Sequence, residues 1–410
     1  MMKEFFKVKT IDQALEYAVQ FPRMASEKVS LTNSVGRILA EDIKSDIDLP
    51  DFSRSIMDGY AVRGSSTFGA GEGNPAFLNI TGTVSMGNKP DLCVGPGEAV
   101  RISTGGMLPP DADSVVMVEH TEEIDDTTIE VYRSVAPGQN MVKVGEDIKK
   151  GDVILRCGGK IRPQEAGMLA ALGKQTVPVY KKPLIGIIST GDEVVAVDES
   201  PGPGQIRDVN TYTLSGLIEE IGATPIPFGI VRDDYEALLA KSSQALAQCD
   251  IVLVSGGSSV GARDFTIDVI TALEDSEILF HGISISPGKP TILARVQNKA
   301  FWGLPGHVVS AMVVFSRIVK PFTEHVSGRA DAYRKKIRLT AKLSRNLASA
   351  QGRVEFIRIR LKQKEGALWA EPILGKSGLI STMVKADGLI EIGMNTEGID
   401  EGAQVEVILV

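Results

Sequence analysis

Uninterrupted apolar strands that alternate with helix-forming segments between residues 184 and 320 constrain the fold of this chain more than any other feature. The runs LIGII at 184–188 and IVLV at 251–254 are apolar throughout, and a helical pattern that stops at Gly222 stands between them. A strand that is apolar at every position has both faces buried, so helices must cover both sides of its sheet. The pattern therefore predicts a doubly wound α/β domain over residues 181–328.

The segments on either side of this domain predict a multidomain chain of class α/β plus β. The length of 410 residues suffices for about three domains of ordinary size. Short strand-like runs separated by Gly, Pro, Asn and Asp predict an inserted β-rich module over residues 48–140. Strand patterns resume after Gly328 and predict a C-terminal β domain over residues 329–410.

Two helical patterns flank the β-rich module. Thr10 and Gln13 have the spacing of a capping box at the start of an amphipathic helix that reaches residue 20. Pro163 stands in the first turn of a second helix. We expect these two helices to pack together in a discontinuous helical and linker domain made of residues 1–47 plus 141–180.

One C-terminal strand is basic on one side. Ile357, Ile359 and Leu361 alternate with Arg358 and Arg360, which predicts a half-buried strand whose basic face is in solvent. Between residues 331 and 364 there are 11 Lys or Arg residues and two acidic residues. Few aromatic residues accompany them, so base stacking on RNA is disfavoured relative to a solvated face or a funnel for a small oxyanion.

Composition excludes several classes of function. Forty-four basic residues against 52 acidic residues give a formal net charge of −8, which provides no general attraction for nucleic acid or anionic membranes. The longest uncharged stretch contains Gly and Pro and is shorter than the roughly 20 residues of a membrane helix. Three cysteines lie far apart, and acidic residues stand where a secretory signal needs an apolar core. We therefore expect a soluble cytoplasmic protein with no nucleic acid and no membrane partner.

Three loops that follow apolar strands are rich in glycine and hydroxyl residues. They are Ser189–Glu193, Ser255–Gly261 and Leu304–His307. In a doubly wound sheet, ligands bind beyond the carboxyl ends of the strands, where glycine exposes backbone N–H groups and a following helix adds partial positive charge. One such loop alone favours an ordinary turn, but three at one edge predict a site for a phosphate or a similar oxyanion.

Acidic residues follow the same strands. Asp192, Glu193, Asp208, Asp233 and Asp264 all fall at this edge of the expected sheet. Asp208, Asp233 and Asp264 precede helices, so N-capping is the favoured interpretation of each one taken singly. Together with the anion-binding loops they favour Mg²⁺, which takes one or two protein oxygens and completes its shell with substrate phosphates and water. Nearby Lys289 is either a solvated turn residue or a point charge for the oxyanion.

Other catalytic motifs are incomplete. Gly375-Lys376-Ser377 resembles the end of a P-loop, but the first glycine of that motif is missing and Pro372 interrupts the segment. No G-x-G-x-x-G opens a βαβ unit, the histidines are scattered, and no G-x-S-x-G elbow is present. Nucleotide-binding and zinc motifs are therefore absent, and a serine hydrolase lacks its usual elbow.

The ordered set of these segments resembles the molybdopterin molybdenumtransferase family, the molybdenum insertases that include the E domain of gephyrin. The resemblance runs over essentially the whole chain. The segments that carry it are Ser55–Val62, Arg101–Gly105, Gly145–Ile148, Ser189–Glu193, Gly204–Asn210, Ser255–Gly261 with Asp264, Pro287–Pro290, Leu304–Gly306 and Ser310. It implies a transferase of molybdenum cofactor biosynthesis with a central molybdopterin-binding α/β domain and a barrel-like C-terminal domain. It also implies a cytoplasmic homodimer that uses Mg²⁺ to cleave adenylylated molybdopterin, release AMP and insert molybdate.

The resemblance assigns roles to individual residues. The implied catalytic residues are Asp58, Thr104, Glu193, Asp233 and Asp264, and the implied metal ligands are Asp192, Glu193 and Asp264. The implied pterin-binding residues are Thr190, Gly191, Asp208, Gly256, Gly257, Ser258, Ser259, Gly261, Gly306 and Ser310. The implied oxyanion pocket comprises Ser286, Lys289, Pro290, Arg353 and Ser377. Asp58 and Thr104 would close the site of the partner subunit, whereas their sequence context alone favours a hairpin turn and a strand end.

Two positions depart from the family pattern. Ser286 stands where many members have a lysine, so the implied oxyanion pocket has one positive charge fewer, and both its affinity and the choice between molybdate and tungstate stay open. Val308 stands where proline is usual.

Two alternative functions also remain open from the sequence. A smaller relative that shares the α/β domain adenylylates molybdopterin, but the β-rich module and the C-terminal domain favour the insertion step. A gephyrin-like scaffold would bind peptides through the C-terminal region, but the converging carboxylates favour an enzyme. The adenylyltransferase and the molybdoenzymes that receive the cofactor are implied protein partners.

Overall fold

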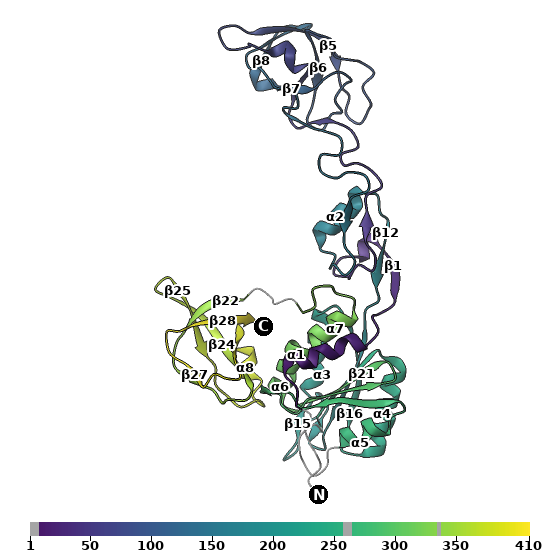
Figure 1. Cartoon of the computed structure of the whole chain (residues 1–410), viewed down its shortest axis with the longest axis vertical. Helices are drawn as coiled ribbons and strands as arrows, with labels where there is room; N and C mark the ends of the chain where they lie inside the picture. The colour runs from purple at the N-terminus through teal and green to yellow at the C-terminus, as the bar shows by residue number, and fades with distance from the viewer. Residues whose placement is uncertain (1–7, 257–264, 334–337) are drawn as a thin grey trace. The chain divides into compact units, whose positions relative to one another are not determined.

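The computed structural model describes residues 8–256, 265–333 and 338–410. These residues divide into two compact units. Figure 1 labels helices and strands of both. The smaller unit consists of Asp42–Arg156 and Met168–Gly173, and the rest of the described chain forms the larger one. The four-domain division expected from the sequence stays a prediction.

A six-stranded sheet lies at the centre of the larger unit. Its order is β16 (Thr224–Val231), β13 (Leu184–Thr190), β17 (Ile251–Ser255), β21 (Lys299–Leu304), β20 (Ile292–Val296) and β18 (Ser276–His281). The first four strands are parallel, and the last two pair antiparallel. The carboxyl ends of β13, β17 and β21 therefore lie at one edge, as a doubly wound fold requires.

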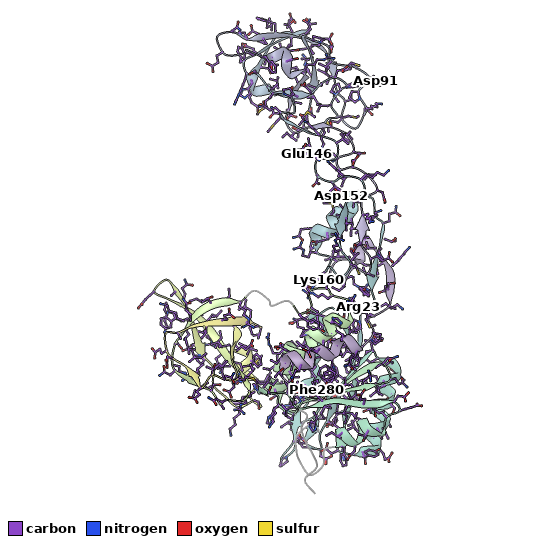
Figure 2. All side chains as sticks on the ribbon, in the orientation of Figure 1. Arg23, Asp91, Glu146, Asp152, Lys160 and Phe280 are labelled. Atoms are coloured by element: carbon purple, nitrogen blue, oxygen red, sulfur yellow. The ribbon has the colours of Figure 1, made fainter. Side chains whose placement is uncertain are left out.

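Helices cover both faces of this sheet, which confirms the predicted α/β class. Ile185 and Ile187 of β13 belong to one core cluster together with α3 (Asn210–Glu220) and α6 (Val308–Val314). Ile188 of the same strand belongs to a second cluster with α4 (Tyr235–Gln248) and α5 (Phe265–Ala272). Phe280, labelled in Figure 2, packs edge-on against Trp302 in the first cluster, with ring centroids 6.0 Å apart.

The first helix differs from its expected packing. Thr10 and Gln13 form the predicted capping box of α1 (Ile11–Glu16), which a 3₁₀ turn extends to Gln20. Ala14 and Ala18 on its buried side belong to the core of the α/β sheet. The expected pairing with the helix that starts at Pro163 is thus wrong, because the large apolar core of the sheet takes up the apolar face of α1.

One helical segment continues through an irregular turn. The helix α6 runs through a π-helical turn, Phe315–Val319, into α7 (Lys320–Val326). Pro321 lies in the first turn of α7. A proline is tolerated there, and π turns accommodate local irregularity inside longer helices.

The C-terminal region forms a closed five-stranded barrel. Its order is β24 (Val354–Lys364), β25 (Ala367–Pro372), β22 (Leu339–Leu343), β28 (Gln404–Leu409) and β26 (Gly388–Ile392), and β26 pairs back onto β24. The short strand β19 (Ile285–Ser286) extends from the α/β domain and pairs with the start of β24. The helix α8 (Ser381–Val384) lies between β25 and β26 in sequence.

The face of β24 that sequence places in solvent is covered near its start. Phe356 belongs to the core cluster of the α/β domain, and Arg358 is only 6% exposed. Arg360, further along, is exposed as expected. The expectation fails at Arg358 because the α/β domain and the segment after β25 pack over this end of the strand.

The smaller unit contains the predicted β-rich module. Its six-stranded sheet has the order β7 (Ser114–Met117), β4 (Gly59–Val62), β6 (Glu98–Ile102), β5 (Ala76–Thr83), β9 (Thr128–Val131) and β8 (Thr121–Asp125). Two strand pairs connect to it: β3 (Arg54–Ser55) with β10 (Met141–Val142), and β2 (Ile43–Lys44) with β11 (Val153–Leu155).

The remaining elements are short. In the larger unit, β1 (Ser26–Ser30) pairs with β12 (Thr176–Tyr180), β14 (Val194–Val195) with β15 (Ile206–Arg207), and β23 (Leu347–Ala348) with β27 (Gly398–Ile399). The predicted second helix is α2 (Pro163–Ala171), and Gly173 follows it with φ +69°. Within the described residues, no helix has the length and apolar character needed to cross a membrane.

Candidate functional site

The three glycine-rich loops begin at the same level of the sheet. Ser189, Ser255 and Leu304 lie side by side in the parallel ladder, so the loops that follow them start together. A Cβ atom on Gly256, which has φ +115°, would stand 2.4 Å from the Thr190 carbonyl oxygen. A Cβ on Gly306 would lie 3.5 Å from the Gly256 Cα. Position 256 therefore requires glycine, while the distance at Gly306 is an ordinary van der Waals contact that places the two loops side by side. The predicted convergence of the loops is present in the described part of each.

Asn210 ties two of these loops to the start of α3. Its side-chain amide donates hydrogen bonds to the Ser255 hydroxyl at 2.6 Å and to the Gly306 carbonyl at 2.8 Å. The Asn210 Oδ1 and the Thr190 Oγ1 are buried and have no hydrogen-bond partner among the described residues. Buried polar atoms without partners are rare in folded proteins, and here they mark an edge able to receive a polar ligand.

Asp208 has a structural task at this edge. It is buried, and its carboxylate accepts hydrogen bonds from the Ser189 hydroxyl and from both the backbone N–H and the hydroxyl of Thr211. The contact with the Thr211 N–H caps the first turn of α3. The capping interpretation of Asp208 therefore describes its contacts well.

Three acids lie on the two neighbouring loops that follow β13 and β16. Asp192 Oδ1 accepts a hydrogen bond from the Asp233 N–H at 3.2 Å, which joins the loops. The Glu193 carboxylate folds back over Gly191, where a Cβ would come within 2.7 Å of it. The helix cap that the sequence favours for Asp233 is instead made by Asp234, whose side chain accepts from the Ala237 N–H.

The donor set at this edge fits a hard cation. Asp192 and Glu193 are exposed, and neither forms an ion pair within the described residues. Carboxylate oxygens free of basic partners suit Mg²⁺, which needs few protein ligands. The described residues contain no group of three or more His, Cys, Asp or Glu side chains placed to hold a metal alone. Gly257, Ser258, Ser259, Gly261 and Asp264 lie outside the described residues.

A pocket of about 250 Å³ lies between the α/β domain and the barrel. Ser286 of β19, Arg358 of β24 and Ser377 of the loop after β25 are among the residues that line it. Ser377 also contacts the start of α6, because its carbonyl accepts from the Val309 N–H and its hydroxyl lies 2.9 Å from His307 Nδ1. The pocket therefore brings two of the predicted oxyanion residues together.

The other predicted oxyanion and pterin residues are placed differently. Lys289 is exposed and Pro290 is half-buried, and neither lines this pocket. Arg353 donates two hydrogen bonds to Glu355, at 2.9 and 3.1 Å, so its charge is already balanced. Ser310 is buried in the first turn of α6, directly after the loop that contains Gly306.

Asp58 and Thr104 meet in the smaller unit. Asp58 Oδ1 accepts from the Thr104 N–H at 2.7 Å and from the Thr104 hydroxyl at 3.1 Å. Both residues are exposed, and Asp58 precedes β4 while Thr104 follows the neighbouring strand β6. The carboxylate is held in one orientation, with its second oxygen forming no hydrogen bond within the described chain.

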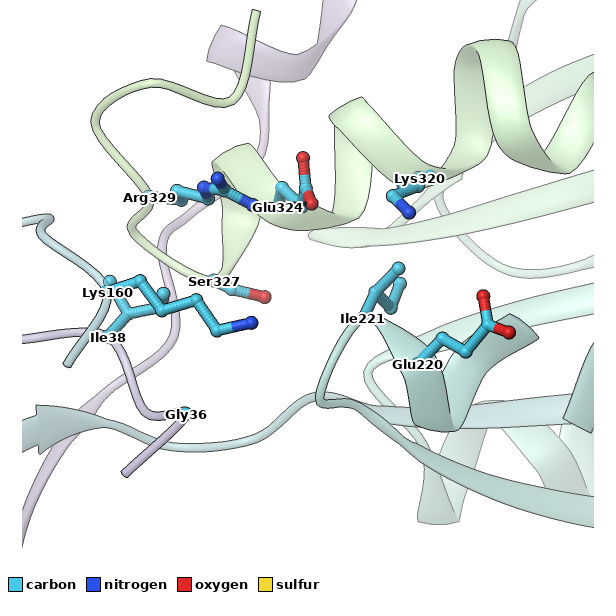
Figure 3. A pocket seen from close by; sticks show the side chains of 9 residues that line it. All are labelled: Gly36, Ile38, Lys160, Glu220, Ile221, Lys320, Glu324, Ser327 and Arg329. Carbon is cyan, nitrogen blue, oxygen red and sulfur yellow. Dashed lines mark hydrogen bonds and ion pairs between the residues drawn. The ribbon is translucent and has the colours of Figure 1, made fainter. Parts of the chain in front are cut away.

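A second pocket contains no residue that the sequence singles out. It has a volume of about 170 Å³, and Figure 3 shows Lys160, Lys320 and Arg329 around it together with Glu220 and Glu324. Glu324 accepts a hydrogen bond from Arg329 at 2.7 Å. Its charges of both signs give this pocket no clear preference for an anion or a cation.

Sequence analysis missed Asn210 and Arg358 as candidate site residues. Asn210 belongs to the quoted run Gly204–Asn210, and its place at the first residue of the helix that follows this run is the signal that points to it. Arg358 has no such signal, since alternation along β24 cannot tell which basic residue other segments cover.

Three family models match consecutive parts of the chain. They are the MoeA N-terminal region (domains I and II) over residues 9–173, a probable molybdopterin binding domain over 186–325, and the MoeA C-terminal region (domain IV) over 340–410. A putative molybdopterin biosynthesis protein of Methanocaldococcus jannaschii is 40% identical over 93% of this chain and 92% of its own length. The molybdopterin molybdenumtransferase of Bacillus subtilis is 32% identical over 98% of this chain and 94% of its own. A crystal structure of the molybdopterin biosynthesis MoeA protein from Pyrococcus horikoshii OT3 matches with a TM-score of 0.85 and 34% identity, covering 98% of this chain and 100% of that one.

Proposed function

Because the chain belongs to the molybdopterin molybdenumtransferase family, the enzymes of MoeA type in molybdenum cofactor biosynthesis, we propose that it inserts molybdate into adenylylated molybdopterin in a Mg²⁺-dependent reaction that releases AMP. The observation that carries the proposal is the meeting of the loops at Thr190, Gly256 and Gly306. Beside them lie Asp192 and Glu193, which form no ion pair within the described residues. That edge offers N–H donors for phosphate groups and carboxylates for a cation.

The residues at the sheet edge divide into two sets. Thr190, Gly191, Gly256, Gly306 and Ser310 are proposed to bind the substrate, with the helix starts of α3 and α6 next to them. Asp192 and Glu193, with Asp264, are proposed to hold Mg²⁺, and the hydrogen bond from Asp233 orients Asp192. When bound, Mg²⁺ supplies positive charge that neutralises phosphate oxygens.

The β-rich module is proposed to act across a homodimer. The bond pattern of Asp58 and Thr104 supports this role, because it fixes an exposed carboxylate in one direction. A cytoplasmic location, the adenylyltransferase as donor of the substrate, and molybdoenzymes as recipients belong to the same proposal.

The direct test incubates the protein with adenylylated molybdopterin, molybdate and Mg²⁺ and measures AMP. Glu193→Gln should lower the rate by roughly a hundredfold or more, because it removes a carboxylate proposed to hold the Mg²⁺ that neutralises the developing phosphate charge. Asp198→Asn is the matched control, since Asp198 is an exposed acid in the segment that follows Glu193. Wild-type protein that releases no AMP, or equal rates for Glu193→Gln and Asp198→Asn, would contradict the proposal.

A mixing experiment tests the shared site. Asp58→Ala and Glu193→Gln are each expected to be inactive as homodimers. After subunit exchange, mixed dimers would contain one intact site and regain AMP release. No recovery after verified exchange would exclude a site built from two subunits.

A further inference from the structure

Arg358 is a buried cation with almost no protein partners. Its side chain lies at the pocket of about 250 Å³ between β19, β24 and the segment after β25. It is 6% exposed, and within the described residues its side chain makes one hydrogen bond, from Nη2 to the Gly375 carbonyl at 2.6 Å. Its Nε is buried and has no partner among those residues. In the described chain, no carboxylate pairs with it, and burial lowers the pKa of this guanidinium with no charged group to offset the effect.

Other arginines with little exposure in the same unit have carboxylate partners. Arg317 pairs with Glu391 at 3.4 Å, and Arg329 pairs with Glu324 at 2.7 Å, as Figure 3 shows for the second pair. Glu355, which lines the same pocket as Arg358, is already paired with Arg353. Arg358, which is more buried than Arg317 and Arg329, thus differs from both in having no carboxylate partner within the described residues.

A buried charge without a counter-charge destabilises the folded protein. When such a charge lies at a pocket, a ligand of opposite charge can neutralise it. The ligand must be an anion. Two hydroxyl residues, Ser286 and Ser377, line the same pocket and add neutral hydrogen-bond donors. A planar guanidinium with unused N–H groups suits the paired oxygens of a tetrahedral oxyanion.

We propose that Arg358 is the cationic group that binds the oxyanion substrate of this protein, in place of the charge that Ser286 does not supply. The identification of the anion as molybdate or tungstate rests on the proposed function. Arg353, whose charge Glu355 balances, is then secondary for anion binding. The assignment differs from the role that family resemblance gives to Arg353.

The test measures oxyanion binding by the full-length protein in the absence of any pterin. Sodium molybdate and sodium tungstate are titrated calorimetrically into wild-type protein, Arg358→Met, Arg358→Lys and Arg360→Met. Arg360 is the matched control, because it lies two positions along β24 and is exposed. We expect the Kd to rise at least tenfold in Arg358→Met, to rise less in Arg358→Lys, and to stay within twofold in Arg360→Met.

A thermal melt of each protein separates binding from folding. If Arg358 serves the ligand, Arg358→Met without oxyanion should melt at or above the wild-type temperature, because an unpaired buried charge has been removed. The rise in melting temperature that saturating molybdate gives the wild type should then be lost. Arg358→Met with wild-type affinity overturns the proposal, and so does a wild-type protein that binds neither anion. If Arg358→Met fails to fold, wild-type affinity in Arg358→Lys overturns it as well.

The two proposals fail separately. Oxyanion binding that depends on Arg358, in a protein that releases no AMP from adenylylated molybdopterin, would refute the proposed function and leave this inference standing. If the wild-type protein releases AMP normally and Arg358→Met binds the oxyanion with unchanged affinity, the proposed function stands and this inference is refuted.

Discussion

The side-chain amide of Asn210 donates to the Gly306 carbonyl at 2.8 Å, and this bond ties the start of α3 to the loop after β21. The same amide reaches the Ser255 hydroxyl at the end of β17. One side chain therefore sets the spacing of two loops that form the candidate substrate site.

Asn210→Ala should loosen these loops. The change removes two hydrogen bonds and leaves the Gly306 carbonyl without that donor, at a cost of about 1–3 kcal/mol in the free energy of unfolding. We expect the KM for adenylylated molybdopterin to rise more than kcat falls, since the loops bind the substrate. Urea unfolding and steady-state kinetics measure both effects, with the exposed turn variant Asn298→Ala as control. An unchanged KM would show that the loops keep their spacing without Asn210.

Gly256→Ala should damage the site far more than an ordinary glycine replacement. Gly256 and Gly204 both have positive φ, at +115° and +83°, so both variants strain the backbone. A Cβ at Gly204 meets nothing within 4 Å, whereas a Cβ at Gly256 stands 2.4 Å from the Thr190 carbonyl oxygen. Gly256→Ala is therefore expected to melt at a lower temperature than Gly204→Ala and to lose AMP release. Similar melting temperatures for Gly256→Ala and Gly204→Ala would mean that the loops of Gly256 and Thr190 can move apart with little loss of stability.

Cys249 should make the stability of the protein fall at alkaline pH. Burial, with a smaller contribution from Asp250, raises the pKa of its thiol to about 11. The raised value means that this group stabilises the folded state below its unfolded pKa near 9 and loses that contribution as the pH rises through about 11. The difference in melting temperature between wild type and Cys249→Ala should shrink between these pH values. Cys93→Ala, at an exposed cysteine, should melt in parallel with the wild type.

Ser286→Lys should strengthen oxyanion binding. Ser286 and Arg358 line one pocket, so the new ammonium would act on the same anion. A charge-assisted hydrogen bond in place of a neutral one should lower the oxyanion concentration needed for half-maximal insertion by roughly one order of magnitude. Without anion, the second positive charge next to Arg358 should lower the melting temperature. The oxyanion concentration for half-maximal insertion should also rise more steeply with salt in Ser286→Lys than in the wild type, because the added attraction is electrostatic. An unchanged concentration for both molybdate and tungstate would show that position 286 does not face the anion.

Much of the α/β domain could be predicted because its signals are local. The apolar runs of β13 and β17 have both faces buried, and Gly222 stands at φ +82° just after α3, where a helix stop was expected. The loops after these strands meet because parallel strands in register end at one edge. Convergence of the glycine loops thus follows from strand type and loop composition alone.

Individual roles within the site were harder to predict. Asp208 and Asp233 both precede helices, yet Asp208 caps α3 while Asp234, not Asp233, caps α4. A shift of one residue changes which carboxylate caps the helix, and a sequence pattern cannot resolve that difference. Asn210 was one polar residue among several in its motif until its partners in two other loops were known.

By itself, the sequence determined the α/β class, the capping box of α1, the β-rich module and the segments that supply the candidate site, because periodicity, caps and turns depend on residues close together in the chain. Only the tertiary structure decided that α1 packs on the sheet and that Arg358 is buried without a carboxylate partner within the described residues. Arg358 and Arg360 are equivalent in the pattern of β24. They differ in burial because segments distant in sequence pack over one end of that strand. Whether a charge is buried depends on those segments rather than on its neighbours in the chain.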